Sequence, residues 1–249
     1  MPLRLNEIID EDPKLMNALI SHITNKPDAL LACGNKDGLL MSYLFKDHNK
    51  KLRLSYYLEK DENGDLHLLD CDATLPSNDI KLTFRKKIND DCYEVSYEDK
   101  HFEVETVNKE IYEAINVNQD YDCSLSLFPF NVVFYDSLEE LNERQGFKEH
   151  GLSSDFICSG SLFNGGKEAY SLLIGKVRTK DSACFKIGEE ELKVTYLTVR
   201  TGLGTLPLVL NSSYDEKVEI GQIMLIAADI KADFAVKECN FYWYSTKTS

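Results

Sequence analysis

Short runs in which apolar and polar residues alternate, separated by turn-forming residues, constrain the fold of this chain more than any other feature. Tyr93, Val95 and Tyr97 alternate with polar residues, and the alternation resumes at Phe102 after a turn at residues 98–101. A period of two indicates a strand with one packed face and one face in water. We therefore expect antiparallel strands in this part of the chain.

The segment from residue 29 to residue 106 contains several such runs. Polar turns at residues 35–38 and 47–50 separate the first three apolar runs, and Asn63-Gly64 is typical of a tight hairpin. This order predicts an antiparallel meander.

A helix is predicted before the meander. Asp12 is a suitable N-cap, Pro13 suits the first helical position, and apolar residues follow at helical spacing from Leu15 to Ile23. We expect this amphipathic helix to cover a sheet, with docking to a partner as the alternative.

Shorter elements are predicted in the middle of the chain. Residues 108–115 and 137–146 have the pattern of short helices, the second with Ser137 as its N-cap. Residues 125–135 have the pattern of a strand. Pro129 within this run predicts an edge position or a bend, because proline cannot donate a hydrogen bond to a sheet.

From residue 155 onward the pattern is again that of strands. Gly175 lies inside an apolar run at residues 170–179, which indicates a bulge or a sharp bend. Further strands are expected at residues 192–200, 206–210 and 222–230. The number of strands and the place of the glycine resemble an OB-fold barrel over residues 155–234. Another small barrel or a sandwich is the alternative.

Together these patterns predict an α+β protein dominated by strands. We expect an N-terminal region, residues 1–150, with a helix and an antiparallel meander, followed by a C-terminal region, residues 151–249, with a small OB-like β-barrel. The glycine and serine residues at 148–154 mark the boundary. Two independent domains and one shared core are both compatible with this pattern.

The charge balance limits the classes of partner. The 249 residues carry a net charge of −14, with a pI of about 4.8, so the chain on average repels nucleic acids and anionic membranes. A basic protein partner is compatible with this charge but is not required by it. No apolar run approaches the length of a membrane span, and acidic residues follow the N-terminus where a signal peptide would be apolar. We therefore expect a cytoplasmic protein without membrane contact.

No motif for catalysis, cofactor binding or metal binding is recognisable, so whether the protein is an enzyme stays open. The seven cysteines include no Cys-x-x-Cys pair, and the five histidines include no metal-binding pair on a helix. Residues 160–167 have the wrong spacing for a phosphate-binding loop, and Glu168 stands where that loop needs a hydroxyl. We expect no cofactor and no metal.

The first of two binding hypotheses is a non-enzymatic protein-binding or adaptor module. It uses four consecutive aromatic residues near the C-terminus, Phe241, Tyr242, Trp243 and Tyr244. Packing of this segment onto the protein's own core is the alternative to an interface.

The second hypothesis is that the C-terminal barrel binds single-stranded nucleic acid through aromatic and basic side chains, as OB-type barrels do. The charge of the whole chain opposes it, but Lys176, Arg178 and Lys180 form a local positive run. The candidate contacts are Phe163, Lys167, Tyr170, Lys176, Arg178, Tyr196 and Arg200.

A second basic run lies in the N-terminal region and consists of Lys81, Arg85, Lys86 and Lys87. We interpret it as the water-facing side of a strand and its turn, with contact to an anionic ligand or an acidic partner as the alternative.

Overall fold

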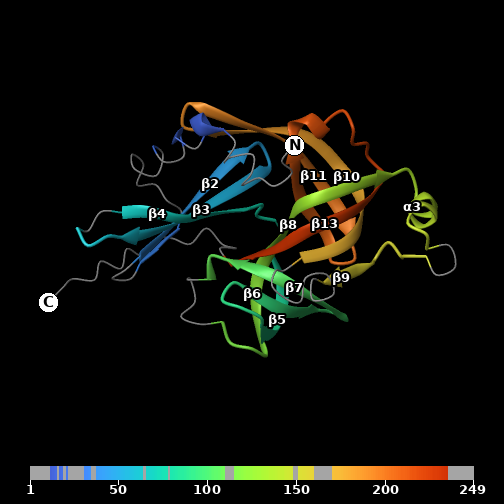
Figure 1. Ribbon diagram of the computed structural model, residues 1–249, viewed down its shortest axis with the longest axis horizontal. Helices are drawn as coiled ribbons and strands as arrows, with labels where there is room; N and C mark the ends of the chain where they lie inside the picture. The colour runs from blue at the N-terminus through green and yellow to red at the C-terminus, as the bar shows by residue number, and fades with distance from the viewer. Residues whose placement is uncertain are drawn as a thin grey trace.

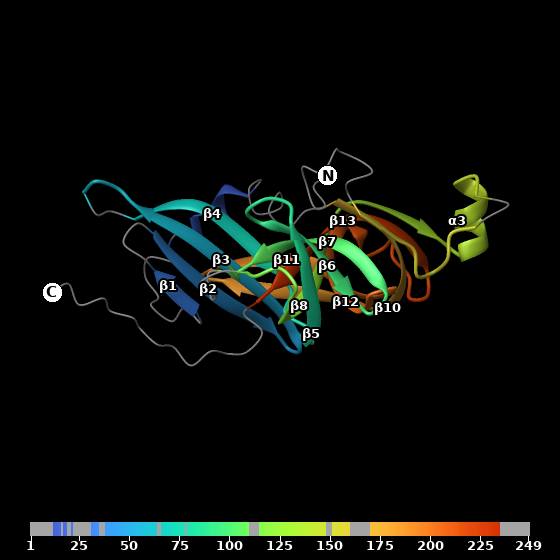
Figure 2. The same ribbon diagram turned by 90° about the horizontal axis from the view of Figure 1, so that it is seen from below.

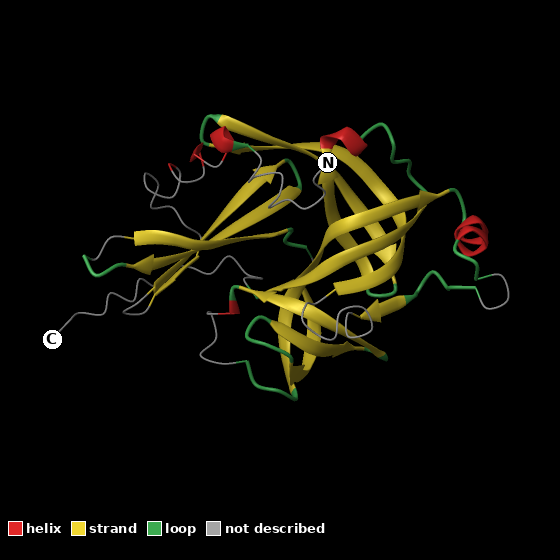
Figure 3. Ribbon diagram, in the orientation of Figure 1, coloured by secondary structure: helices red, strands yellow, loops and turns green. Residues whose placement is uncertain are grey.

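The computed structural model describes residues 12–15, 17–18, 21, 31–34, 38–63, 66–77, 79–109, 115–147, 151–159 and 170–234. Strands dominate these residues, and most strand pairs are antiparallel (Figure 1, Figure 3). The predicted dominance of strands is therefore confirmed. None of the helices in these residues is long and apolar enough to cross a membrane.

The first sheet is an antiparallel meander, as the sequence predicts. Its four strands follow one another in the order of the chain: β1 (Leu31–Gly34), β2 (Gly38–Asp47), β3 (Lys50–Lys60) and β4 (Leu66–Thr74).

The second sheet has nine strands and includes residues from both sides of position 150. Its strands are β5 (Asp79–Lys87), β6 (Cys92–Tyr97), β7 (Lys100–Val107), β8 (Gln119–Tyr135), β9 (Ile157–Ser159), β10 (Tyr170–Ile187), β11 (Glu190–Thr201), β12 (Gly204–Asn211) and β13 (Ile223–Asp233). The order is β11-β12-β8-β5-β6-β7-β13-β10-β9, and β10 also pairs with β11 and β8 with β13. A helix α3 (Leu138–Arg144) follows β8, and a 3-10 turn η2 (Ser212–Tyr214) follows β12.

Two predicted helix starts are confirmed by their capping hydrogen bonds. The carboxylate of Asp12 accepts from the backbone N–H groups of Lys14 and Leu15, at 3.0 and 3.2 Å. The hydroxyl of Ser137 accepts from the N–H of Glu140 at 3.1 Å. Each bond satisfies a donor that the first helical turn leaves free.

The nine-stranded sheet contains two four-stranded units with the same pairing pattern, β5–β8 and β10–β13. In each unit the first strand pairs with the second and the fourth, and the second pairs with the third, always antiparallel. The third strand of each unit runs parallel to the fourth strand of the other unit. The two fourth strands pair with each other, with Leu127 opposite Ile230. Exchanging the units leaves this pattern of pairs unchanged, apart from the pairing of β9 with β10.

The register shifts of the two units also occur at equivalent positions. The pairing of β5 with β6 shifts after Phe84, and the pairing of β10 with β11 shifts after Val177. Up to this point each first strand pairs with the fourth strand of its unit, and beyond it mainly with the second. Because a bulge bends a strand, both first strands can take part in two pairings.

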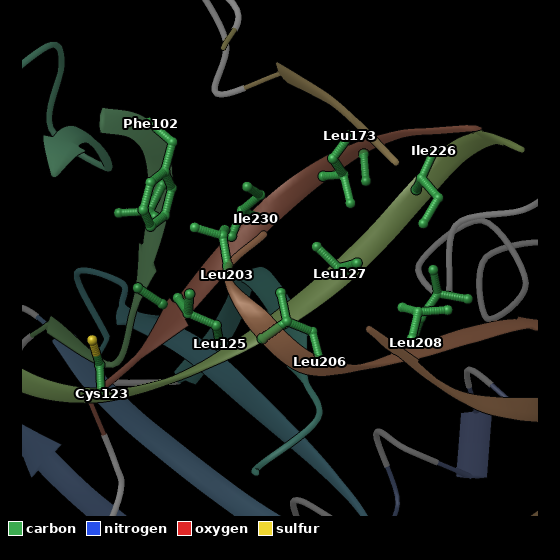
Figure 4. Close-up of a cluster of buried hydrophobic side chains, with 14 of the residues drawn as sticks. Phe102, Cys123, Leu125, Leu127, Leu173, Leu203, Leu206, Leu208, Ile226 and Ile230 are labelled. Atoms are coloured by element: carbon green, nitrogen blue, oxygen red, sulfur yellow. The ribbon is translucent and has the colours of Figure 1, made fainter. Parts of the chain in front are cut away.

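One hydrophobic core lies between the strands of both units. Figure 4 shows Phe102, Cys123, Leu125 and Leu127 from the first unit beside Leu173, Leu206, Leu208, Ile226 and Ile230 from the second. Residues from both sides of position 150 therefore share a core, which is one of the two arrangements that the sequence leaves open.

Two further clusters attach the remaining elements to this sheet. Leu52, Leu54 and Tyr56 of β3 pack against Phe185 and Val194 of the β10–β11 hairpin. Leu15, beside the Asp12 cap, joins the same cluster, so the N-terminal helical residues do cover a sheet. A separate cluster holds Leu141 of α3 against β8, β10 and β13. Figure 2 shows the four-stranded sheet and α3 at opposite ends of the molecule.

Two predictions about strands can be compared with the pairing. Strand β8 borders β5, β12 and β13, but the pairs described for residues 128–135 are with β13 alone, so Pro129 lies at a local edge and at a bend, as predicted. The pairing with β13 shifts between Ala227 and Ala228, where Pro129 lies, and a bulge accepts a residue without an N–H. Strand β10 also continues to Ile187, beyond the predicted end at residue 179, because its polar residues still pair with β11. Residues 110–114 of the predicted 108–115 helix lie outside the described residues.

Candidate functional site

Charged side chains gather in two places, and the first is a buried junction between the two sheets. The guanidinium of Arg53 on β3 donates to the carboxylate of Asp233 on β13 at 2.7 Å, and both side chains are buried. The same carboxylate accepts from Thr74 and Asn108, each at 2.7 Å. Asn108 has a left-handed backbone with φ of 58°, which brings its amide toward Asp233 and the hydroxyl of Ser55. Every polar atom of the Asp233 carboxylate therefore has a donor.

A second ion cluster extends the junction along β13. The ammonium of Lys231 lies 2.6 Å from the carboxylate of Asp72 and 3.3 Å from that of Glu105, and 5.3 Å from the ring centre of Phe128. Burial alone would lower the pKa of Lys231, but the two carboxylates outweigh it and the pKa lies above its usual value. Burial raises the pKa of Glu105 even though Lys231 lowers it.

This junction is built to hold the sheets together. Its charges are buried or partly buried and are matched by opposite charges, and charges taken out of water are tolerated only when they are paired and hydrogen-bonded. A ligand would have to break these contacts to reach them. We therefore look for a binding site elsewhere.

The second gathering is a solvent-facing cluster of cations on the β10–β11 pair, which we call the basic face: Lys176, Arg178 and Arg200. Lys176 lies directly opposite Arg200, and Arg178 occupies the bulge. All three side chains are exposed. None of them forms an ion pair with a carboxylate in the part of the chain that the structure describes. In a chain with a net charge of −14, an unneutralised group of cations attracts anions locally.

Lys180, which the sequence places in the same basic run, is used differently. Its ammonium donates to the backbone carbonyl oxygens of Asp215 and Val218, at 2.7 and 3.0 Å. This cation therefore anchors the segment after β12 and is not part of the basic face.

The corresponding bulge in β5 provides an internal comparison. Arg85 occupies it, as Arg178 does in β10, but its Nε donates to the hydroxyl of Ser96 at 2.9 Å. The next residue, Lys86, lies opposite Glu94, and Lys87 pairs with Asp90 at 2.7 Å. The carboxylates around this bulge partly neutralise its cations.

The equivalent positions around the basic face carry no carboxylate. Thr198 stands opposite the bulge of β10, where Glu94 stands opposite that of β5. Ile223 stands opposite Lys176, where Asp120 stands opposite Thr83. The two units therefore share a backbone pattern, but at these positions carboxylates occur only in the first unit.

The aromatic residues predicted to bind nucleic acid do not gather at the basic face. Tyr170 lies at the start of β10, half-buried, with its ring centre 4.7 Å from that of Phe130. Tyr196 is buried in the cluster under the first sheet, and burial raises its pKa to about 12. Phe163, Lys167 and the aromatic run at residues 241–244 lie outside the described residues.

Sequence reasoning missed the inter-sheet junction entirely. Arg53 and Asp233 are 180 positions apart, and no local pattern connects them. It did find the three members of the basic face, because Lys176 and Arg178 are close in sequence and Arg200 ends a predicted strand.

The described residues contain no group of three or more His, Cys, Asp or Glu side chains that could hold a metal ion. A scan of protein-family models, a search of curated proteins and a search of solved structures each found no match to this chain.

Proposed function

We propose that this protein is a non-enzymatic protein-binding module, and that the basic face of β10 and β11 holds an acidic segment of its partner. The observation that carries the proposal is the set of exposed cations at Lys176, Arg178 and Arg200, for which the described residues supply no carboxylate partner. An acidic segment that neutralises them gains Coulomb energy in a chain that otherwise repels anions.

The size of this effect is modest for a surface site. Exposed ion pairs are worth about 0.2–1 kcal/mol each, so three of them supply roughly 1–2 kcal/mol, or about a tenfold change in affinity. Electrostatic pairs of this kind set orientation and the rate of association more than total affinity. Additional contacts must supply the rest.

Single-stranded nucleic acid is the second candidate ligand. The strands β10, β11, β12, β8 and β13 pair in a circuit that is antiparallel except between β12 and β8. An OB-type barrel also has five strands, and such barrels bind single strands through a basic groove. The buried ring of Tyr196 argues against this candidate, since sequence-tolerant binding of single strands depends on stacking with exposed aromatic rings.

Fluorescence anisotropy with two labelled probes, an oligo-glutamate peptide and an oligo-thymidine, tests the proposal at low and high salt. We expect the peptide to bind at low salt and the triple variant K176A/R178A/R200A to bind about tenfold more weakly. The matched control is K81A/R85A/K86A, which removes the same charge around the β5 bulge and is expected to leave binding nearly unchanged.

The outcomes separate the candidates. Tighter binding of the oligo-thymidine, lost in the same triple variant, would support nucleic acid instead of protein. Absence of binding by either probe at low salt, or equal losses in both triple variants, would refute a specific role for the basic face.

A further inference from the structure

An exposed apolar side chain stands beside the basic face on a turn that leads into β13. Ile220 is 66% exposed, the highest value among the exposed large hydrophobic residues of the described chain. Covering an exposed aliphatic side chain of this size with another apolar group is favourable, because it removes apolar surface from water.

The turn that carries Ile220 is fixed to the bulge of β10. The N–H of Gly221 donates to the carbonyl oxygen of Val177 at 3.0 Å, and the N–H of Val177 donates to that of Gln222 at 3.0 Å. Val218, two residues before Ile220, is buried in the main core. Ile220 and Arg178 are therefore each one residue away from a pair of backbone hydrogen bonds that joins the turn to the bulge.

The first unit contains the same arrangement. The N–H of Asn118 donates to the carbonyl oxygen of Phe84, the residue before the β5 bulge, at 2.6 Å. Asn118 and Gly221 both have a left-handed backbone, with φ of 63° and 98°. The residue before Asn118 is Val117, which is 47% exposed. An exposed aliphatic side chain therefore occurs at the same place in both units, next to the same bulge.

Single exposed hydrophobic residues are common and usually need no explanation. The repetition at equivalent turns, and the neighbouring bulge arginine in each unit, distinguish these two. In the second unit the turn that carries Ile220 is bonded to the bulge beside Arg178, and Lys176 and Arg200 pair next to this bulge.

We propose that Ile220 is an apolar anchor of the basic face, so that its occupant is an acidic protein segment that also carries an aliphatic side chain. This inference rests on the proposed function and specifies its ligand. A pure polyanion would leave Ile220 in water. A segment with an aliphatic residue among its carboxylates would cover Ile220 while neutralising Lys176, Arg178 and Arg200.

The test compares two labelled glutamate-rich peptides that differ at one position, leucine in the first and serine in the second, each titrated with the full chain. We expect the leucine peptide to bind about tenfold more tightly, which corresponds to about 1.4 kcal/mol. This difference should persist at high salt, because apolar contact is not screened as charge pairs are. Ile220→Ser is expected to abolish it, and Ile220→Leu to preserve it.

Val117→Ser serves as the matched control, since it changes the equivalent tip beside the neutralised bulge and is expected to leave both affinities unchanged. If the two peptides bind equally and both lose affinity in K176A/R178A/R200A, the anchor is refuted and the proposed function stands. If neither peptide binds, the proposed function fails. Equal effects of Ile220→Ser and Val117→Ser would also overturn the assignment.

Discussion

The buried pair of Arg53 and Asp233 predicts a large and specific loss of stability when one partner is neutralised. Asp233→Asn keeps the shape of the side chain, but its single amide oxygen can replace only one of the two carboxylate oxygens that accept from Thr74 and Asn108, and it leaves the guanidinium of Arg53 without its counter-charge. Arg53 is only 5% exposed, so water cannot replace the lost carboxylate. Removing one member of a buried pair costs about 3–5 kcal/mol.

The double variant distinguishes loss of the pair from loss of packing. Arg53→Met removes the other charge, and by itself it leaves the carboxylate of Asp233 buried without its cation. In Arg53→Met/Asp233→Asn no charge remains at this point. The two single losses should therefore not add, and we expect a coupling of about 2–3 kcal/mol between them.

Urea unfolding followed by far-ultraviolet circular dichroism measures these free energies, from the midpoint and the slope of each transition. Lys87→Ala is the control, because it removes an exposed pair with Asp90 and should leave the free energy of unfolding nearly unchanged. Thr74→Val, which removes one donor and keeps the charges, gives a milder variant if Asp233→Asn does not fold. Losses below about 1 kcal/mol for both charge variants, or fully additive losses, would refute the reasoning.

Two further predictions concern the cluster around Lys231 and the centre of the main core. Burial raises the pKa of Glu105 in the folded protein, so its contribution to stability is present at low pH and is lost as the pH rises through that raised pKa. Glu105→Gln should therefore be at least as stable as the wild type at neutral pH, and its gain in free energy of unfolding should disappear on acidification. Urea titrations at several pH values measure this gain, and a gain that grows on acidification would contradict the prediction. Leu127 is fully buried opposite Ile230, where the two units meet. We expect Leu127→Ala to lower the free energy of unfolding by about 2–5 kcal/mol, and Val133→Ala, at an exposed position of the same strand, to lower it far less.

Local sequence patterns predicted the features that depend on residues close together in the sequence. The caps at Asp12 and Ser137 follow from side-chain oxygens that reach the next helical turn, and the strands from Tyr93 to Val104 follow from their alternation. The bend at Pro129 was also foreseen, and near it β8 pairs with β13 alone. Each of these features needs information from only a few positions along the chain.

The partners of each strand were decided by the tertiary structure alone. Strand β8 borders β5, β12 and β13, and its own residues do not distinguish these neighbours, because backbone hydrogen bonds are the same in all of them. The division into two regions at residues 150 and 151 stays a prediction. The two four-stranded units share a core, and strands of one unit pair with strands of the other.

The same contrast holds for the candidate site. The sequence by itself placed Lys176, Arg178 and Lys180 in one basic run of a predicted strand. The tertiary structure decided that Arg200 joins them, that Lys180 turns away to the carbonyl oxygens of Asp215 and Val218, and that Ile220 stands beside them. Charge neutralisation depends on distances between side chains, and folding sets those distances across segments that the linear order keeps apart.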